Sequence, residues 1–141
     1  MTSTAVIDAN IAIYAVLPSP FHQVAISLLR RLVEEGIVIY VPHLWLCEVG
    51  SGIRKIATLT RLPEEQKILQ AAFDLPVEIA DEDYNLYLSA YTIAKELNQK
   101  TIYDAIYIAL ANRVNGVFFT ADRSLYHNCR NKRIGNVYLL E

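Results

Sequence analysis

The chain has 141 residues, of which 53% are hydrophobic and 20% are charged, and its formal charge is −2. This length suits one domain with a buried core, so residues 1–141 are treated as a single domain. The near-neutral charge excludes a globally basic nucleic-acid-binding surface, and any such site has to be local. Cys47 and Cys129 form no CxxC pair, which argues against a zinc knuckle or a dithiol redox motif and fits a reducing compartment.

The predicted elements alternate between strands and helices. In chain order, the first half is predicted to contain strand 4–7, helices 10–16 and 21–35, strand 37–41, and helices 42–57 and 63–73. The second half is predicted to contain strand 76–80, helices 82–97 and 102–114, strand 117–119, helix 122–129 and strand 136–140. Pro18 and Pro20 separate the first two helices, Gly36 ends the second, and Asp81 is expected to cap the helix that starts at residue 82.

No segment is predicted to enter a membrane. The N-terminus lacks a basic region, and Asp8 interrupts its apolar run. The longest uncharged stretch, residues 9–29, contains two prolines and several polar residues. We therefore expect a soluble, cytoplasmic protein.

Strands that are apolar on both faces and alternate with helices predict an α/β fold. We expect three layers, α/β/α, around a mainly parallel sheet of four or five strands. Ligands in such folds bind beyond the carboxyl ends of the strands. Asp8 and Asp122 follow strands 4–7 and 117–119, so both acids are expected at that edge. If they share a site, these two strands are neighbours at the centre of the sheet.

Two further acids stand out because their surroundings are apolar. Glu48 lies in PHLWLCEVGSG, which is otherwise uncharged, and Asp104 begins a helix that is apolar nearly all round and therefore predicted to be buried. A buried carboxylate is costly unless it is paired, hydrogen-bonded or bound to a cation. The dipole of the helix offsets only about 0.3–1 kcal/mol of that cost.

Each of these acids also has an ordinary structural explanation. Two of them could cap the helices that follow, Asp104 could be a first-turn acid, and Glu48 could pair with Arg54 or Lys55. Four carboxylates with no histidine or cysteine pattern are instead typical of a site for a hard cation such as Mg²⁺ or Mn²⁺. Both explanations stay open on chemistry alone.

Four segments occur in the order and spacing of one known family. They are VIDAN (6–10), PHLWLCEV (42–49), TIYDAIYIALA (101–111) and VFFTADRSL (117–125). Through them the sequence resembles the PIN-domain ribonucleases, and specifically the VapC-like toxins of VapBC-type toxin–antitoxin pairs, over essentially the whole chain. The resemblance implies a PIN-like fold and an endoribonuclease that uses Mg²⁺ or Mn²⁺ to hydrolyse RNA phosphodiester bonds. It also implies a homodimer and a cognate antitoxin partner.

The family's functional residues carry over to matching positions. The catalytic and metal-binding acids would be Asp8, Glu48, Asp104 and Asp122. Asn10 and Thr120 match the polar residues that would orient a carboxylate or a water beside them. The sequence Gly50-Ser51-Gly52 is looser than the helical sequence usual after the second acid, and we expect it to distort that helix and the aim of Glu48.

Contacts with RNA have to come from local positive charge. Arg54 and Lys55 follow Glu48 by about two helical turns, and Arg123 adjoins Asp122, so these three are the candidate phosphate contacts. The cations at 130–133 are interpreted as a solvated face. None of the three histidines has the spacing of a triad or a zinc site.

Three tyrosines, Tyr84, Tyr87 and Tyr91, share one face of a predicted helix. Such a stripe is mostly core or interface, and less often a platform for nucleobases.

Other functional classes fit less well. A haloacid-dehalogenase-like phosphatase needs a second aspartate where Asn10 stands, and a receiver domain needs an acidic pair near the first strand and a late lysine. The phosphate-binding motifs GxxxxGK[ST] and GxGxxG do not occur. The remaining alternative is a PIN-like RNA-binding or interaction module without strong catalysis.

Overall fold

The computed structural model describes residues 3–141. The strands in this range are β1 (Thr4–Ile7), β2 (Val38–Val41), β3 (Val77–Ile79), β4 (Val117–Thr120) and β5 (Val137–Leu139). The helices are α1 (Ala9–Val16), α2 (His22–Glu34), α3 (His43–Thr60), α4 (Glu65–Phe73), α5 (Tyr84–Glu96), α6 (Tyr103–Arg113) and α7 (Arg123–Lys132). Each predicted element is present, with ends that differ by a few residues.

All five strands form one parallel sheet in the order β3-β2-β1-β4-β5. Val6 in β1 pairs with Tyr40 of β2 on one side and with Phe118 of β4 on the other. The prediction that strands 4–7 and 117–119 are central neighbours is therefore confirmed. Because the sheet is parallel, the carboxyl ends of β1 and β4 meet at the same edge.

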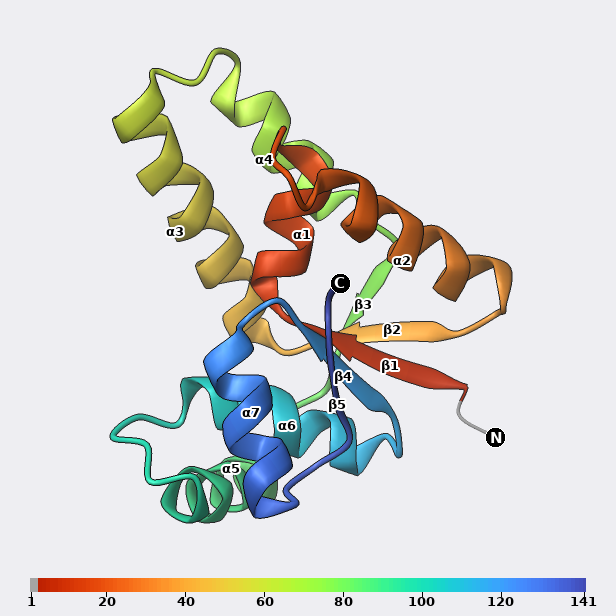
Figure 1. Cartoon of the computed structure of the whole chain (residues 1–141), viewed down its shortest axis with the longest axis vertical. Coiled ribbons are helices and arrows are strands. Elements are labelled where there is room, and N and C mark those ends of the chain that lie inside the picture. The colour runs from red at the N-terminus through yellow and green to blue at the C-terminus, as the bar shows by residue number, and fades with distance from the viewer. Residues whose placement is uncertain (1–2) are drawn as a thin grey trace.

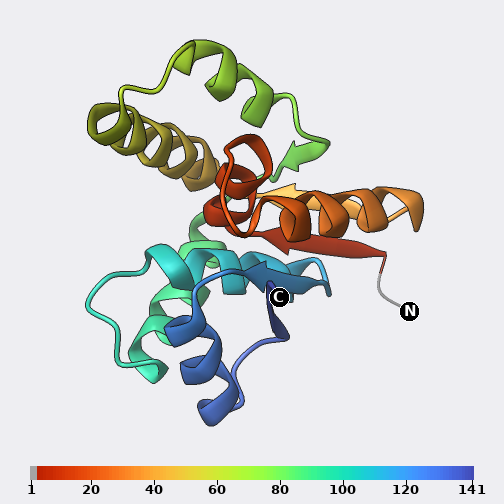
Figure 2. The same cartoon turned by 45° about the horizontal axis from the view of Figure 1, so that its top comes forward.

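Helices cover the sheet on both faces, which confirms the three-layer α/β/α fold. Helices α1 to α4 lie on one side and α5 to α7 on the other, as the two views together show (Figures 1 and 2). Helix α6 packs directly on β1 and β4, and α5 packs on α6. Helices α3 and α4 pack on each other and on α1, and extend away from the sheet (Figure 1).

The centre of the sheet and α6 form the most buried part of the core. Ala5, Val6 and Ile7 of β1 are at most 1% exposed, and every residue of α6 from Ala105 to Ala111 is buried. The prediction of a buried helix after Asp104 is confirmed. Among the described residues, 3–141, no helix is long and apolar enough to span a bilayer.

The predicted cap of α5 was wrong by two residues. Asp83, and not Asp81, is the N-cap, and its carboxylate accepts a hydrogen bond from the Leu86 amide at 3.0 Å. Glu82, which was predicted to be helical, accepts instead from the His43 amide at 2.8 Å and from the Tyr87 hydroxyl at 2.6 Å. A tertiary contact with the start of α3 thus decides where α5 begins.

The expected distortion at Gly50-Ser51-Gly52 is absent, because α3 runs as one α-helix from His43 to Thr60. The two glycines have different surroundings. A Cβ added at Gly50 would meet nothing within 4 Å, whereas a Cβ at Gly52 would overlap with Ile13 Cδ1 of α1. Gly52 therefore permits the close approach of α1 to α3.

This difference predicts opposite effects for two alanine substitutions. Gly50→Ala should raise the free energy of unfolding by about 0.5–1 kcal/mol, because alanine has the higher helix propensity. Gly52→Ala should be less stable than Gly50→Ala by about 1–2 kcal/mol, because the added methyl overpacks against Ile13. Urea denaturation checks both, and Ile13→Val, which removes the opposing methyl, should restore stability to Gly52→Ala. Equal stabilities of the two alanine variants would contradict this packing.

Candidate active site

The four predicted acids come from four elements that surround the carboxyl ends of the central strands. Asp8 directly follows β1, and Asp122 lies two residues after the end of β4. Glu48 is in the second turn of α3, which follows β2, and Asp104 is the second residue of α6. The amide of Asp8 donates to the Phe119 carbonyl at 2.9 Å, which joins the ends of β1 and β4.

Asp8 is the most buried of the four acids, with 8% of its surface exposed. Its Oδ1 accepts a hydrogen bond from the Ala9 amide at 2.8 Å. Its Oδ2 accepts from the Thr120 hydroxyl at 2.8 Å and from Asn10 Nδ2 at 3.3 Å. Both carboxylate oxygens are therefore held by donors from two neighbouring strand ends.

Thr120 and Asn10 extend this network towards Asp122. The Thr120 hydroxyl, which is fully buried, accepts from the Asp122 amide at 3.0 Å. Asn10 Oδ1 accepts from the Ala121 amide at 3.2 Å, which orients the Asn10 side chain and leaves its Nδ2 towards Asp8. The two polar residues thus connect the loop after β1 with the loop after β4.

Glu48 and Asp104 are each held by a hydrogen bond that the sequence did not predict. The Tyr107 hydroxyl donates to Glu48 Oε1 at 2.6 Å, and Gln99 Nε2 donates to Asp104 Oδ2 at 3.2 Å. A signal for Tyr107 was present, because a phenol in a helix that is apolar all round needs a buried partner. Gln99 lies in a loop, and nothing in the sequence paired it with Asp104.

The acids are close enough to influence one another electrostatically. Burial raises the pKa of Asp8 from 3.8 to about 7; the charges of Asp104 and Glu48 add to this, and the Thr120 hydrogen bond opposes it. Burial, followed by the charges of Asp122 and Glu48, also raises the pKa of Asp104. Repulsion between like charges in a partly dry environment explains both directions.

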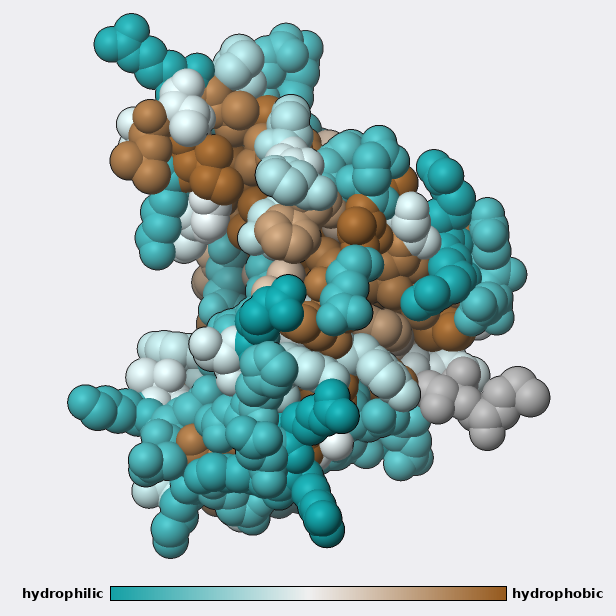
Figure 3. Space-filling view, viewed as in Figure 1, coloured by the Kyte–Doolittle hydropathy of each residue, from teal (hydrophilic) through white to brown (hydrophobic). Residues whose placement is uncertain are grey.

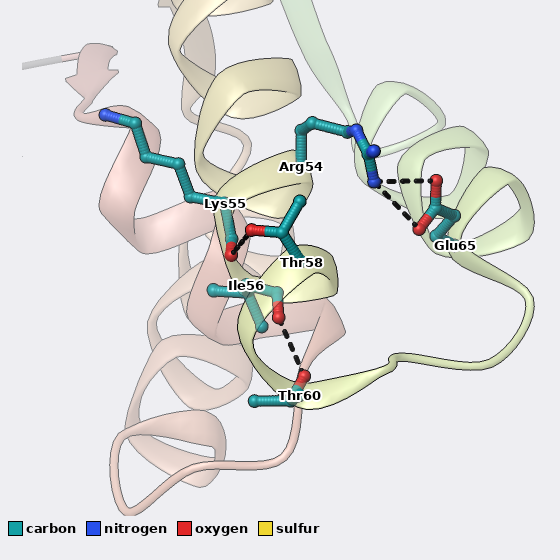
Figure 4. A network of polar contacts seen from close by, with 6 residues as sticks. All are labelled: Arg54, Lys55, Ile56, Thr58, Thr60 and Glu65. Atoms are coloured by element: carbon teal, nitrogen blue, oxygen red, sulfur yellow. Dashed lines mark hydrogen bonds and ion pairs between the residues drawn. The ribbon is translucent and has the colours of Figure 1, made fainter.

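No positively charged side chain in the described part of the chain pairs with these acids. Within residues 3–141, none of the four acids forms an ion pair. The alternative that Glu48 pairs with Arg54 is wrong, because Arg54 lies 3.4 Å from Glu65 of α4, and the Lys55 side chain points away from them (Figure 4). The uncompensated charge is therefore available to an external cation.

The capping explanations hold for the two acids at strand ends. Asp8 is the N-cap of α1, and Asp122 is the N-cap of α7, where its Oδ1 accepts from the Leu125 amide at 3.0 Å. A cap uses one oxygen of a carboxylate, so this structural role does not compete with a second role for the other oxygen. Asp122 is exposed, in contrast to Asp8.

The donor set suits a hard divalent cation, because it consists of carboxylate oxygens with uncompensated charge. In the part of the chain that the structure describes, however, no three acidic, histidine or cysteine side chains are arranged to hold one ion. The carboxylates of the four acids are instead oriented by their hydrogen bonds to other groups of the protein.

The three candidate RNA contacts differ in whether the side chain is already paired within the protein. Arg54, Lys55 and Arg123 are all exposed, but Arg54 forms an ion pair with Glu65. Arg123 is the first residue of α7 and follows the acid Asp122 directly. Of the three, Arg123 lies nearest in sequence to an acid of the site.

Comparison with known proteins identifies the family. A model of the PIN domain matches residues 5–131, and the chain therefore belongs to the PIN-domain family. Within this family it is VapC-like: it is 35% identical to Ribonuclease VapC1 from two strains of Mycobacterium tuberculosis, over 100 residues that make up 70% of this chain and 72% of that protein.

Solved structures agree with the fold. The crystal structure of VapBC2 from Rickettsia felis, bound to a DNA fragment from their promoter, matches with a TM-score of 0.66 and 21% identity over 96% of both chains. PAE2754 from Pyrobaculum aerophilum matches with a TM-score of 0.65 and 24% identity, over 91% of this chain and 87% of that one. At these identities the two structures support the fold alone.

Proposed function

We propose that this protein is a divalent-metal-dependent endoribonuclease and the toxin of a toxin–antitoxin pair. One observation carries the catalytic part, namely the convergence of Asp8, Glu48 and Asp104: burial, together with the charges of Asp104 and Glu48, raises the pKa of Asp8 to about 7. The similarity to Ribonuclease VapC1 supports RNA as the substrate. The alternative, an RNA-binding module without strong catalysis, leaves the uncompensated carboxylates unexplained.

Asp8, Glu48, Asp104 and Asp122 would hold Mg²⁺ or Mn²⁺. A bound divalent ion would neutralise the phosphate and lower the pKa of a water that attacks phosphorus. Thr120 and Asn10 keep the Asp8 carboxylate in place. Both also accept hydrogen bonds from backbone amides of the loop after β4, which fixes the position of Asp122 relative to Asp8. The position of Arg123 at the start of α7 suits contact with a flanking phosphate, and Lys55 provides a second exposed cation.

Activity with and without metal tests the proposal. Purified protein should cleave single-stranded RNA in Mg²⁺ or Mn²⁺, leave 5′ phosphates, and lose this activity in chelator. Asp122→Asn is the matched variant, because asparagine also caps helices and keeps α7 intact while removing the charge. RNA that remains uncut by the unmodified chain in both metals, but is retained in a binding assay, would favour the binding-module alternative.

Two apolar surfaces suit the proposed partners in the cytoplasm. Apolar residues gather over the half of the molecule formed by α1 to α4 (Figure 3), where Leu59 is 82% exposed and Phe21 40%. This surface would be covered by the antitoxin. The similarity to Ribonuclease VapC1 supports such a partner, because the VapC-like toxins that this chain resembles are paired with a cognate antitoxin. Co-purification with the product of the adjacent open reading frame, and relief of growth arrest by it, would test this part.

A second apolar surface suits a homodimer. The tyrosine stripe of α5 is not core, because Tyr84, Tyr87 and Tyr91 are 90%, 39% and 66% exposed. Leu88, on the same side of the helix, is 65% exposed. Their spacing forms one helix face, which a second copy of the chain could cover by helix-on-helix packing.

Changing this face should produce a monomer. Leu88→Lys should abolish dimerisation in sedimentation equilibrium, while it alters the free energy of unfolding of the single chain by about 0.5 kcal/mol or less. The control is Leu59→Lys, a similarly exposed leucine on α3. A dimer that survives Leu88→Lys would place the interface elsewhere.

A further inference from the structure

A buried phenol lies beside the acids. Tyr107 is one helical turn after Asp104 on α6 and is 1% exposed. Its ring stacks on Phe118 of β4, with centroids 5.5 Å apart and planes inclined by 23°. The close-packed core around the ring therefore fixes the direction of its hydroxyl, which donates to Glu48 Oε1 at 2.6 Å.

Glu48 has few other restraints. Among residues 3–141, Tyr107 is the one side chain that donates a hydrogen bond to it, whereas Asp8 accepts from three donors. Glutamate has three rotatable side-chain bonds, and an unrestrained carboxylate samples many rotamers. The aim of Glu48 therefore depends on one contact from across the site.

We propose that Tyr107 is a positioning residue for Glu48. By donating to Oε1, the phenol holds the carboxylate in one orientation and leaves Oε2 for the divalent cation or its water. The inference rests on the proposed function, because a positioning role needs a centre in which Glu48 takes part. Helix α6 then contributes twice to the site, through Asp104 directly and through Tyr107 by way of Glu48.

The test is a double-substitution cycle read by metal binding in the absence of RNA. Tyr107→Phe removes only the hydroxyl and should weaken Mn²⁺ affinity, measured by electron paramagnetic resonance, about ten- to hundredfold, as loss of a supporting contact typically does. Glu48→Gln should weaken it at least as much. Because Tyr107 acts through Glu48, the double variant should bind Mn²⁺ as Glu48→Gln alone does. RNA cleavage should follow the same non-additive pattern.

Tyr138→Phe is the matched control. Tyr138 also stacks on a phenylalanine of β4, Phe119, at 5.9 Å and 29°, but it is 51% exposed. This variant should bind Mn²⁺ and cleave RNA as the unmodified chain does. If Tyr107→Phe unfolds, Glu48→Asp gives the same test, because it keeps the charge but is one methylene too short for the phenol.

The outcomes separate the two proposals. Unchanged Mn²⁺ affinity in Tyr107→Phe, or additive losses in the double variant, would overturn the positioning role while the nuclease proposal stands. If Glu48→Gln itself binds Mn²⁺ and cleaves RNA normally, Glu48 is not part of the centre and the proposed function loses that residue.

Discussion

Asp104→Asn is expected to abolish RNA cleavage and, at the same time, to leave the metal-free protein at least as stable as the unmodified chain. The substitution keeps the shape of a side chain that burial and the charges of Asp122 and Glu48 destabilise in its ionised form. Relief of that repulsion should contribute about 1 kcal/mol to the free energy of unfolding in chelator. The Gln99 hydrogen bond can be retained, because asparagine still offers one acceptor oxygen.

The response to metal separates a ligand from a structural acid. Mg²⁺ at a hundredfold excess over its Kd should stabilise the unmodified chain by about 2.7 kcal/mol, and Asp104→Asn should gain much less. Cleavage should fall at least about a hundredfold, since loss of a ligand removes several kcal/mol of charge stabilisation. The measurements are urea denaturation in chelator and in Mg²⁺, together with an RNA cleavage assay.

Asp74→Asn is the matched control for Asp104→Asn. Asp74 likewise accepts a hydrogen bond from a glutamine, Gln70, at 2.9 Å, but on the exposed end of α4. Asp74→Asn should leave both RNA cleavage and the stabilisation by Mg²⁺ unchanged. Asp104 would be structural, and the proposed centre would lose a ligand, if Asp104→Asn were markedly less stable in chelator yet stabilised by Mg²⁺ as fully as the unmodified chain.

In chelator, the stability of the protein is expected to fall as pH rises from 4 to 7. The pKa of Asp8 is 3.8 in its ordinary state and about 7 in the folded protein. Between these values the unfolded chain has released the proton and the folded chain retains it. Stability therefore declines with rising pH, by up to about 4 kcal/mol from this residue, and the contribution is lost above pH 7.

Asp8→Asn should remove most of this slope, because asparagine does not titrate. The difference in unfolding free energy between the two proteins, measured by urea denaturation at pH 5, 6, 7 and 8 in chelator, isolates the contribution of Asp8. Asp83→Asn is the control, since its hydrogen bond with Arg113 lowers the pKa of Asp83, so that it is ionised throughout this range in both states. A slope that Asp8→Asn leaves unchanged would show that Asp8 is already ionised at low pH in the fold.

Saturating Mg²⁺ should reverse the trend, because a cation favours the ionised carboxylate. At pH 8 the metal should therefore stabilise the unmodified chain more than it does at pH 5.

The local pattern of the sequence was sufficient for the elements and for their arrangement. Apolar runs such as Ala5–Ile7 identified the strands, and the helical spacing between them identified the covering helices. Alternation of the two then required a parallel sheet, because only crossover helices join parallel strands in this way. The errors were at element ends, as at the start of α5, where the backbone amide of His43 donates to Glu82 and the helix begins after Asp83 instead of after Asp81.

The identity and sequence positions of the candidate acids could also be predicted, because a carboxylate after a buried strand or in an apolar helix is costly without a reason. What each carboxylate contacts could not be predicted. Tyr107 and Gln99 hold Glu48 and Asp104 from positions 59 and 5 residues away in the chain. Contacts at such separations, and the side-chain directions they impose, depend on how α6 packs against β1 and β4.

The sequence by itself therefore determined the layers, the central strand pair and the four acids, since hydrophobic periodicity and the burial cost of charge act locally along the chain. Only the tertiary structure decided that α3 continues as one helix through its glycines, that Arg54 pairs with Glu65, and that the pKa of Asp8 rises to about 7. Each of these depends on packing distance, because the close approach of α1 to α3 at Gly52, ion pairing and desolvation all arise between groups that the fold brings together.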